Sequence, residues 1–160
     1  GTTESVLESF QGLEHRFEDL GTFFDVRYVN DSKSTTIASL AWALERVGAG
    51  CVLIAGGRHK GGDFHQLRDL VRKKVTFLIL IGEAKKEMEK AFSDLASVYP
   101  VETLEEALRV ARVVGRPGQT VLFSPACASF DMFQDYQHRG QQFKAILAGW
   151  RRSLSPEVMQ

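Results

Sequence analysis

Three short stretches of this chain carry the residue types that bind small anions. They are residues 30–36 (NDSKSTT), 56–64 (GGRHKGGDF) and 124–131 (SPACASFD). Lys33 and Lys60 supply positive charge, and the hydroxyls of Thr35 and Ser129 can donate hydrogen bonds. Backbone amides at a helix start add a further site for a carboxylate or phosphate. The three stretches predict a site for an acidic ligand, with Asp31 orienting a lysine or helping to arrange a metal-bound nucleotide.

The central, glycine-rich stretch resembles a phosphate-binding loop in composition, but it lacks the Walker A signature. Gly56 and Gly61 have the required spacing, whereas Gly62-Asp63 follows where Lys and then Ser or Thr are required. Four glycines in this loop would let the backbone approach a ligand closely. The alternative is a solvated turn between a strand and a helix. For the hydroxyl residues of the other stretches, the alternative is simple helix capping.

Cysteine and histidine chemistry has weaker support in this sequence. Cys51 and Cys127 adjoin apolar strands, which favours buried small side chains and a reducing compartment over a disulfide. A nucleophilic Cys127 would need a base beside it. The histidines lack the spacing of metal ligands, so we predict no metal site. They are His15, His59, His65 and His138.

Alternating strands and helices are needed to position the three stretches. Apolar runs at 52–55, 75–81 and 120–124 predict buried parallel strands. Residues 16–20 and 23–29 predict an antiparallel pair at the sheet edge, turning at Gly21-Thr22. The remaining predictions are a short strand at 97–101 and helices at 3–10, 37–47, 64–73, 84–95, 103–114 and 141–150.

The predicted fold class is therefore α/β, with a Rossmann-like, mostly parallel sheet flanked by helices and an antiparallel edge strand. The carboxyl ends of parallel strands share one edge of a sheet, and ligands bind beyond that edge. Because each anion-binding stretch follows a strand, we expect all three to converge on one site.

Composition indicates an ordinary globular protein with a single domain, residues 1–160. Apolar residues make up 44% of the chain and charged residues 25%. The formal net charge is zero, which gives no support for binding nucleic acid or a membrane surface. Without a signal peptide or a membrane-spanning apolar run, a cytoplasmic location is expected. The first residue is Gly1, consistent with a piece of a longer protein.

Five motifs, in order, resemble the C-terminal domain of the Mur ligases, and most of all the members that add D-glutamate. They are GLEHRFE (12–18), NDSKSTT (30–36), GGRHKGGDF (56–64), SPACASFDMF (124–133) and RGQQF (139–143). Together these motifs cover nearly the whole chain. Two departures stand out: Ser34-Thr35-Thr36 replaces the more frequent Ala-Thr-Asn, and His59 replaces a frequent acidic residue.

The resemblance implies the third domain of an ATP-dependent, amide-forming ligase of bacterial peptidoglycan synthesis. Two preceding domains would bind UDP-N-acetylmuramoyl-L-alanine and hold most of the ATP and Mg²⁺. ATP would phosphorylate the substrate carboxylate, and the amine of D-glutamate would attack the acyl phosphate. The chain alone would be inactive and monomeric.

The resemblance also implies roles for particular residues. Thr35 and Ser129 would hydrogen-bond the carboxylates of D-glutamate, and Lys60 would pair with one of them. Phe130 and Tyr136 would shape the pocket, although the family commonly has Phe at the position of Tyr136.

The nucleotide-facing residues implied by the resemblance are His15, Arg16, Asp31 and Lys33. For His15, Arg16 and Arg139, the alternative is a structural role that ties loops together. Two further hypotheses remain for the chain as a whole. One is a stand-alone nucleotide- or phosphate-binding α/β module, and the other is a structural domain whose turns only contact its neighbours.

Overall fold

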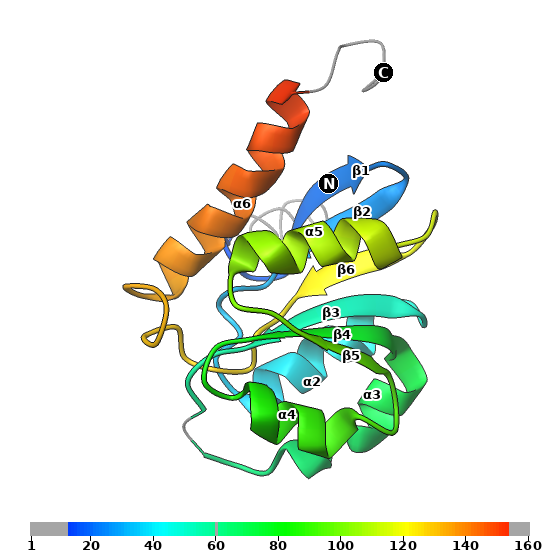
Figure 1. Ribbon diagram of the computed structural model, residues 1–160, viewed down its shortest axis with the longest axis vertical. Helices are drawn as coiled ribbons and strands as arrows, with labels where there is room; N and C mark the ends of the chain where they lie inside the picture. The colour runs from blue at the N-terminus through cyan, green and yellow to red at the C-terminus, as the bar shows by residue number, and fades with distance from the viewer. Residues whose placement is uncertain (1–12, 60, 154–160) are drawn as a thin grey trace, which may run out of the picture.

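Strand β3 (Cys51–Gly56) lies inside a six-stranded sheet whose order is β1-β2-β6-β3-β4-β5 (Figure 1). The computed structural model describes residues 13–59 and 61–153. Neighbouring strands are parallel except for β1 and β2. The other elements are β1 (Glu18–Phe23), β2 (Val26–Asn30), α2 (Ile37–Arg46), the 3-10 helix η1 (Phe64–Leu67), α3 (Arg68–Lys74), β4 (Val75–Ile81), α4 (Lys85–Phe92), β5 (Ser97–Pro100), α5 (Leu104–Val114), β6 (Thr120–Phe123) and α6 (Tyr136–Ser153). This architecture confirms the predicted fold class.

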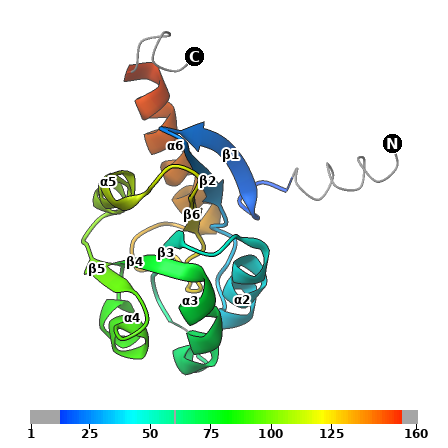
Figure 2. The ribbon, with the colours of Figure 1, turned by 90° about the vertical axis from the view of Figure 1, so that its right-hand side faces the viewer.

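Helices cover both faces of the sheet because the central strands are apolar on both sides (Figure 2). Leu53 and Ala55 of β3 pack with the core beneath α2, η1, α3 and α4. Val52 and Ile54 point the other way and pack with the core beneath α5 and α6. In the part of the chain that the structure describes, no helix is long and apolar enough to cross a membrane.

The predicted antiparallel edge pair is present, but the predicted turn position is wrong. The register pairs Thr22 with Arg27 and Phe23 with Val26, so the turn lies at Phe24–Asp25. Both turn residues have positive φ, 55° and 67°, as a two-residue hairpin turn with the right twist requires. Gly21, with φ of 93°, instead lies where the register shifts within β1.

The last helix begins at Tyr136, five residues before the predicted start at 141. The Asp135 carboxylate accepts a hydrogen bond from the His138 amide (2.7 Å), which satisfies one of the free donors at the helix start. Gly140 sits where a Cβ would collide with His15, so close packing explains this glycine. The predicted helix at 3–10 lies outside the described residues.

The other predicted elements are present with small shifts at their ends. The strand at 75–81 has the predicted bounds. Residues 64–67 form a 3-10 turn before α3, and α4 ends at Phe92 rather than at 95. Thr103, the predicted first residue of the helix at 103–114, caps α5, since the Thr103 hydroxyl accepts from the Glu106 amide (3.0 Å).

Candidate functional site

The three anion-binding stretches meet at the carboxyl edge of the sheet, as predicted. The Gly56 amide donates to the Pro125 carbonyl oxygen (3.0 Å). Arg58 and Ala128 exchange two backbone hydrogen bonds of 2.9 Å. The Asp31 amide donates to the Phe123 carbonyl oxygen at the end of β6 (2.7 Å). The turns after β2, β3 and β6 are therefore joined directly through their backbones.

Arg139, from the first turns of α6, ties the turn after β2 to the turn after β6. Its guanidinium is 1% exposed and donates to Ser32 Oγ (3.0 Å), Ser32 O (2.6 Å) and Cys127 O (2.9 Å). Burial lowers the pKa of Arg139 to about 10, which still leaves it charged at neutral pH. The loop-tying role that the sequence left open for Arg139 is therefore confirmed.

Two glycines of the turns serve packing between backbones rather than approach to a ligand. A Cβ on Gly57 would lie 2.5 Å from the Ala128 carbonyl oxygen. A Cβ on Gly82, at the end of β4, would lie 2.7 Å from Gly57 Cα. The predicted open approach to a ligand remains for Gly61, where a Cβ would have no atom within 4 Å.

Four of the five residues expected to hold an amino acid line one cavity of about 240 Å³. They are Thr35, Ser129, Phe130 and Tyr136, joined by Thr36, Ala128 and Asp135. Phe130 is 55% exposed, while the residue before it, Ser129, is buried. The fifth expected residue, Lys60, lies outside the described residues. The cavity combines hydroxyl groups with aromatic walls.

A second cavity of about 380 Å³ lies beside the first and shares Thr36 with it. Its lining brings together Arg16, Asp31 and Lys33, three of the four residues expected to face a nucleotide. Trp42, one and a half turns into α2, forms part of the wall. The Lys33 ammonium lies 6.0 Å from the Tyr136 ring, which belongs to the first cavity. The two cavities are therefore neighbours at the start of α2.

Comparisons with known proteins show which family the chain belongs to. A family model described as "Mur ligase, glutamate ligase domain" matches residues 15–127, which is more than half of the chain. The chain belongs to the Mur ligase family.

Relatives with D-glutamate ligase names match nearly the whole of this Mur ligase domain. The UDP-N-acetylmuramoylalanine--D-glutamate ligase of Chlorobium phaeobacteroides is 48% identical over 147 residues, 92% of this chain and 32% of the relative. The ligase of the same name from Aquifex aeolicus is 47% identical over 148 residues, 92% of this chain and 36% of the relative. This chain thus spans about a third of the length of the relatives it matches.

A solved structure supports the fold of this Mur ligase domain. The crystal structure of the UDP-N-acetylmuramate-alanine ligase from Thermotoga maritima superposes with a TM-score of 0.61. It covers 94% of this chain and is 17% identical, with the match taking up 33% of that chain. At this identity the likeness concerns the fold alone.

Asp31 of this Mur ligase domain is a buried carboxylate that joins three segments. Its Oδ1 accepts from the Phe17 amide (2.8 Å), and its Oδ2 accepts from Ser124 Oγ (2.7 Å). Burial raises the pKa of Asp31 to about 6, against the smaller lowering effects of these hydrogen bonds and of Arg16 and Arg139. Both oxygens are occupied within the fold, so Asp31 orders the wall of the second cavity.

We expect Asp31→Asn to stabilise the domain above pH 6 and to have little effect near pH 4. The folded state binds a proton at Asp31 between its ordinary pKa of 3.8 and its raised value of about 6, so this carboxyl's contribution to stability falls as pH rises through that window. Above this window, the raised pKa of Asp31 lowers the free energy of unfolding by about 3 kcal/mol at most. Urea unfolding of both proteins across this pH range measures the difference. A variant less stable than the wild type above pH 6 would contradict the assignment.

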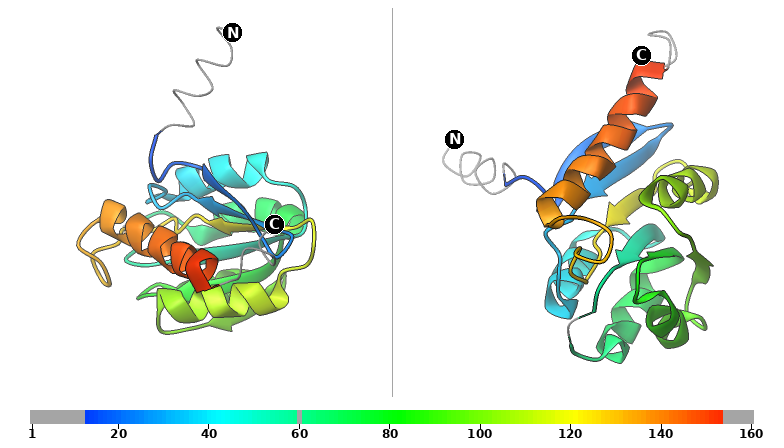
Figure 3. Two further views of the ribbon diagram at one scale, coloured as in Figure 1. Left: turned by 90° about the horizontal axis from the view of Figure 1, so that it is seen from above. Right: turned by 60° about the vertical axis from the view of Figure 1, so that its left-hand side comes forward.

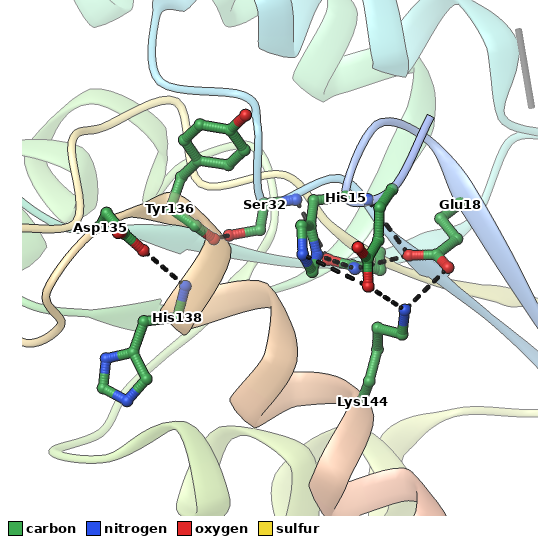
Figure 4. Close-up of polar contacts among 9 residues, drawn as sticks. His15, Glu18, Ser32, Asp135, Tyr136, His138 and Lys144 are labelled. Atoms are coloured by element: carbon green, nitrogen blue, oxygen red, sulfur yellow. Dashed lines mark hydrogen bonds and ion pairs between the residues drawn. The ribbon is translucent and has the colours of Figure 1, made fainter. Parts of the chain in front are cut away.

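His15 lines neither of these two cavities and lies in a polar cluster under α6, with its ring centroid 6.3 Å from that of Tyr136, a residue of the first cavity (Figure 4). Its side chain is 2% exposed, and its Nδ1 accepts from Asn30 Nδ2 (2.9 Å). Burial lowers the pKa of His15, which favours the neutral ring. The His15 carbonyl accepts from the Lys33 amide (2.8 Å), so His15 reaches the second cavity only through this backbone contact.

The sequence did not predict the rest of this polar cluster. Lys144 of α6 pairs with Glu14 (2.9 Å) and Glu18 (3.0 Å), and Glu18 accepts from Asn30 Nδ2 (3.0 Å). In Figure 4 the Lys144 side chain extends from the helix toward Glu18, beside His15. These residues fix the segment that precedes β1 against α6. The only sequence feature that indicated this cluster is that Glu14, His15 and Glu18 lie in one motif.

The two cysteines are buried and unpaired, as predicted from their apolar surroundings. Burial raises the pKa of each thiol to about 12. A thiol of that pKa is protonated at neutral pH and is a poor nucleophile. Cys127 contributes its carbonyl oxygen to Arg139 instead.

Proposed function

We propose that this chain holds D-glutamate for an ATP-dependent ligase of bacterial peptidoglycan synthesis that acts on UDP-N-acetylmuramoyl-L-alanine. The observation that carries the proposal is the cavity of about 240 Å³ lined by Thr35, Ser129, Phe130 and Tyr136. It lies in a chain that is 47–48% identical to two proteins named as D-glutamate ligases.

The chemistry of this cavity suits a dicarboxylic amino acid. The hydroxyls of Thr35 and Ser129 can donate to a carboxylate, and the Lys60 ammonium can pair with the second carboxylate. With both carboxylates bound, the amine is free to point out of the cavity toward the acyl phosphate of the other substrate. The amine then attacks the acyl carbon and phosphate leaves, which forms the amide bond. Positioning of the amine is the domain's contribution to the rate.

The neighbouring cavity of about 380 Å³ suits part of the nucleotide. Arg16 and Lys33 supply cations for phosphate groups, and hydroxyls of Ser34 and Thr36 add donors. Each oxygen of Asp31 accepts a hydrogen bond that joins segments of the fold, so we give Asp31 an ordering role rather than that of a Mg²⁺ ligand. Among the described residues, no group of three or more histidines, cysteines or carboxylates is placed to hold a metal ion. We therefore assign Mg²⁺ and most of the ATP contacts to a preceding domain.

An amide-resolved NMR titration of this chain with D-glutamate, L-glutamate and ADP in turn tests the proposal. We expect D-glutamate alone to shift the amides of Thr35 and Ser129, with smaller effects at residues on α4. Shifts with ADP and none with either glutamate would favour the alternative, a stand-alone nucleotide- or phosphate-binding module.

A chimera tests the activity of the whole ligase. It joins this chain to the part of the Aquifex aeolicus relative that precedes the matched region. We expect the chimera to form the amide product from ATP, D-glutamate and UDP-N-acetylmuramoyl-L-alanine, and this chain alone to form none. The sequence has no Walker A motif, which is the reason for the expected inactivity. Product formation by this chain alone would contradict the proposal that the reaction requires a preceding domain.

A further inference from the structure

Five exposed arginines gather on α5, on the turn after it and at the end of α6, away from the three turns of the site. They are Arg109, Arg112, Arg116, Arg151 and Arg152. Figure 3 shows α5 and α6 on the same face of the sheet, with α2 on the opposite face. Among residues 13–59 and 61–153, none of these five arginines forms an ion pair with a carboxylate. Their positive charge is therefore directed to the solvent.

Aromatic rings hold two of these arginines in place. The guanidinium carbon of Arg112 lies 4.1 Å from the ring centroid of Phe24 and 5.3 Å from that of Trp150. The guanidinium carbon of Arg151 lies 4.7 Å from the Phe23 ring. Such contacts position a guanidinium without neutralising its charge. Backbone contact between Gly118 and Asp25 (2.9 Å) joins the turn after α5 to the hairpin turn of β1 and β2.

Two apolar side chains project among the arginines. Phe24, at the tip of the hairpin, is 41% exposed, and Val113, next to Arg112, is 83% exposed. We refer to the five arginines together with Phe24 and Val113 as the basic end. The zero net charge of the whole chain conceals this local excess of positive charge.

The basic end lies opposite the candidate site. Parallel strands place the site at their carboxyl ends, whereas the hairpin tip and the end of α6 lie toward the other end of the sheet (Figures 1 and 3). The segment before β1 contacts the site edge, since the His15 carbonyl accepts from the Lys33 amide.

We propose that the basic end docks this protein on a membrane surface that carries anionic phospholipids. Guanidinium groups bind phosphate in a bidentate manner, and each arginine near an anionic surface adds to the attraction. Exposed Phe and Val side chains among basic residues are typical of proteins that lie at the level of the lipid headgroups. The basic end is built from three separate segments: α5 with the turn after it, the end of α6 and the hairpin tip. Its charges are therefore spread over several elements, which suits a surface that carries many phosphates.

Vesicle co-sedimentation of the full 160-residue chain tests the proposal at neutral pH and low salt. We expect binding to vesicles that mix phosphatidylcholine with phosphatidylglycerol, and no binding to vesicles of phosphatidylcholine alone. The triple variant Arg109→Glu, Arg116→Glu and Arg152→Glu should weaken binding by roughly 100-fold or more. These three arginines make no described side-chain contact within the fold, so the variant is expected to fold.

The matched control reverses the same number of charges elsewhere. Lys73→Glu, Lys86→Glu and Lys90→Glu change three exposed lysines of α3 and α4 and give the same net charge as the arginine variant. This control should keep most of the binding. Phe24→Asn removes the exposed ring at a position whose positive φ asparagine accepts, and it should weaken binding several-fold.

Other outcomes overturn the proposal. Equal loss of binding in the two triple variants would mean that net charge, and not the basic end, is responsible. Binding to poly-glutamate with no binding to the anionic vesicles would indicate an acidic protein partner instead. No binding to the anionic vesicles at low salt would remove the proposal outright.

Discussion

Arg139→Met is expected to lower the free energy of unfolding by about 3–5 kcal/mol. The substitution keeps a long side chain but removes a buried guanidinium that makes three hydrogen bonds. The carbonyl oxygens of Ser32 and Cys127 would then be buried without a donor from residue 139. Each buried group that loses its partner costs about 1–3 kcal/mol. Urea unfolding of both proteins at neutral pH gives the difference.

The local effect of Arg139→Met should fall on the site. Arg139 joins the turn that carries Thr35 to the turn that carries Ser129, so both turns should loosen together. In NMR spectra, the amides of these two residues should shift or broaden more than those of α4. Arg116→Met, at an exposed arginine whose side chain has no described contact, serves as the control and should change stability by less than about 0.5 kcal/mol. An Arg139→Met protein as stable as this control would contradict the role of the guanidinium.

Sequence patterns predicted the elements well where hydrophobic periodicity is strong. Strand β4 has the predicted bounds because residues 75–81 are nearly all apolar and buried on both faces. The convergence of the three turns also followed, since it depends only on parallel strands sharing one edge. These features come from local composition and from general rules of sheet topology.

Several predictions made from glycines were wrong, because a glycine can serve a turn, a bulge or close packing. Gly21 marks a bulge rather than a turn, and Gly140 lies inside α6, where it makes room for His15. Gly57 and Gly82 allow two backbones to pack closely. For Gly57, Gly82 and Gly140 the cause is a contact with a residue distant in sequence, which a local pattern does not contain.

The sequence indicated which polar residues lie near the site edge, but it did not indicate which partners they bind. Asp31 lines the second cavity, and its two oxygens also join the segment before β1 to the end of β6. His15 packs beneath α6 with Asn30, and its role toward the nucleotide stays a prediction. Partner identity at such positions depends on side chains from other elements. The cavity residues Thr35 and Ser129 were easier to predict, because each lies in a turn that directly follows a strand.

Lys60→Ala is expected to raise the KM of the chimeric ligase for D-glutamate by roughly 10- to 100-fold, because a charge-assisted hydrogen bond is worth about 1.5–3 kcal/mol. The residues on both sides of Lys60 are held in place. Arg58 is bonded to Ala128, and His59 Nε2 donates to the Gly62 carbonyl oxygen (2.8 Å). The His59 ring also packs on Phe64, with centroids 4.2 Å apart. The residues around Lys60 in this loop are therefore anchored to the rest of the domain.

The division of the effect between KM and kcat identifies what Lys60 does. If Lys60 binds a carboxylate that is equally charged before and during amine attack, its loss should raise KM for D-glutamate and leave kcat and the KM for ATP nearly unchanged. Lys86→Ala, at an exposed lysine of α4, is the matched control and should change neither constant. A rise in the KM for ATP alone would move Lys60 to the nucleotide. Unchanged constants would indicate that the glycine-rich turn has only a structural role, and Thr35 and Ser129 would then have to bind the amino acid without a cation from this loop.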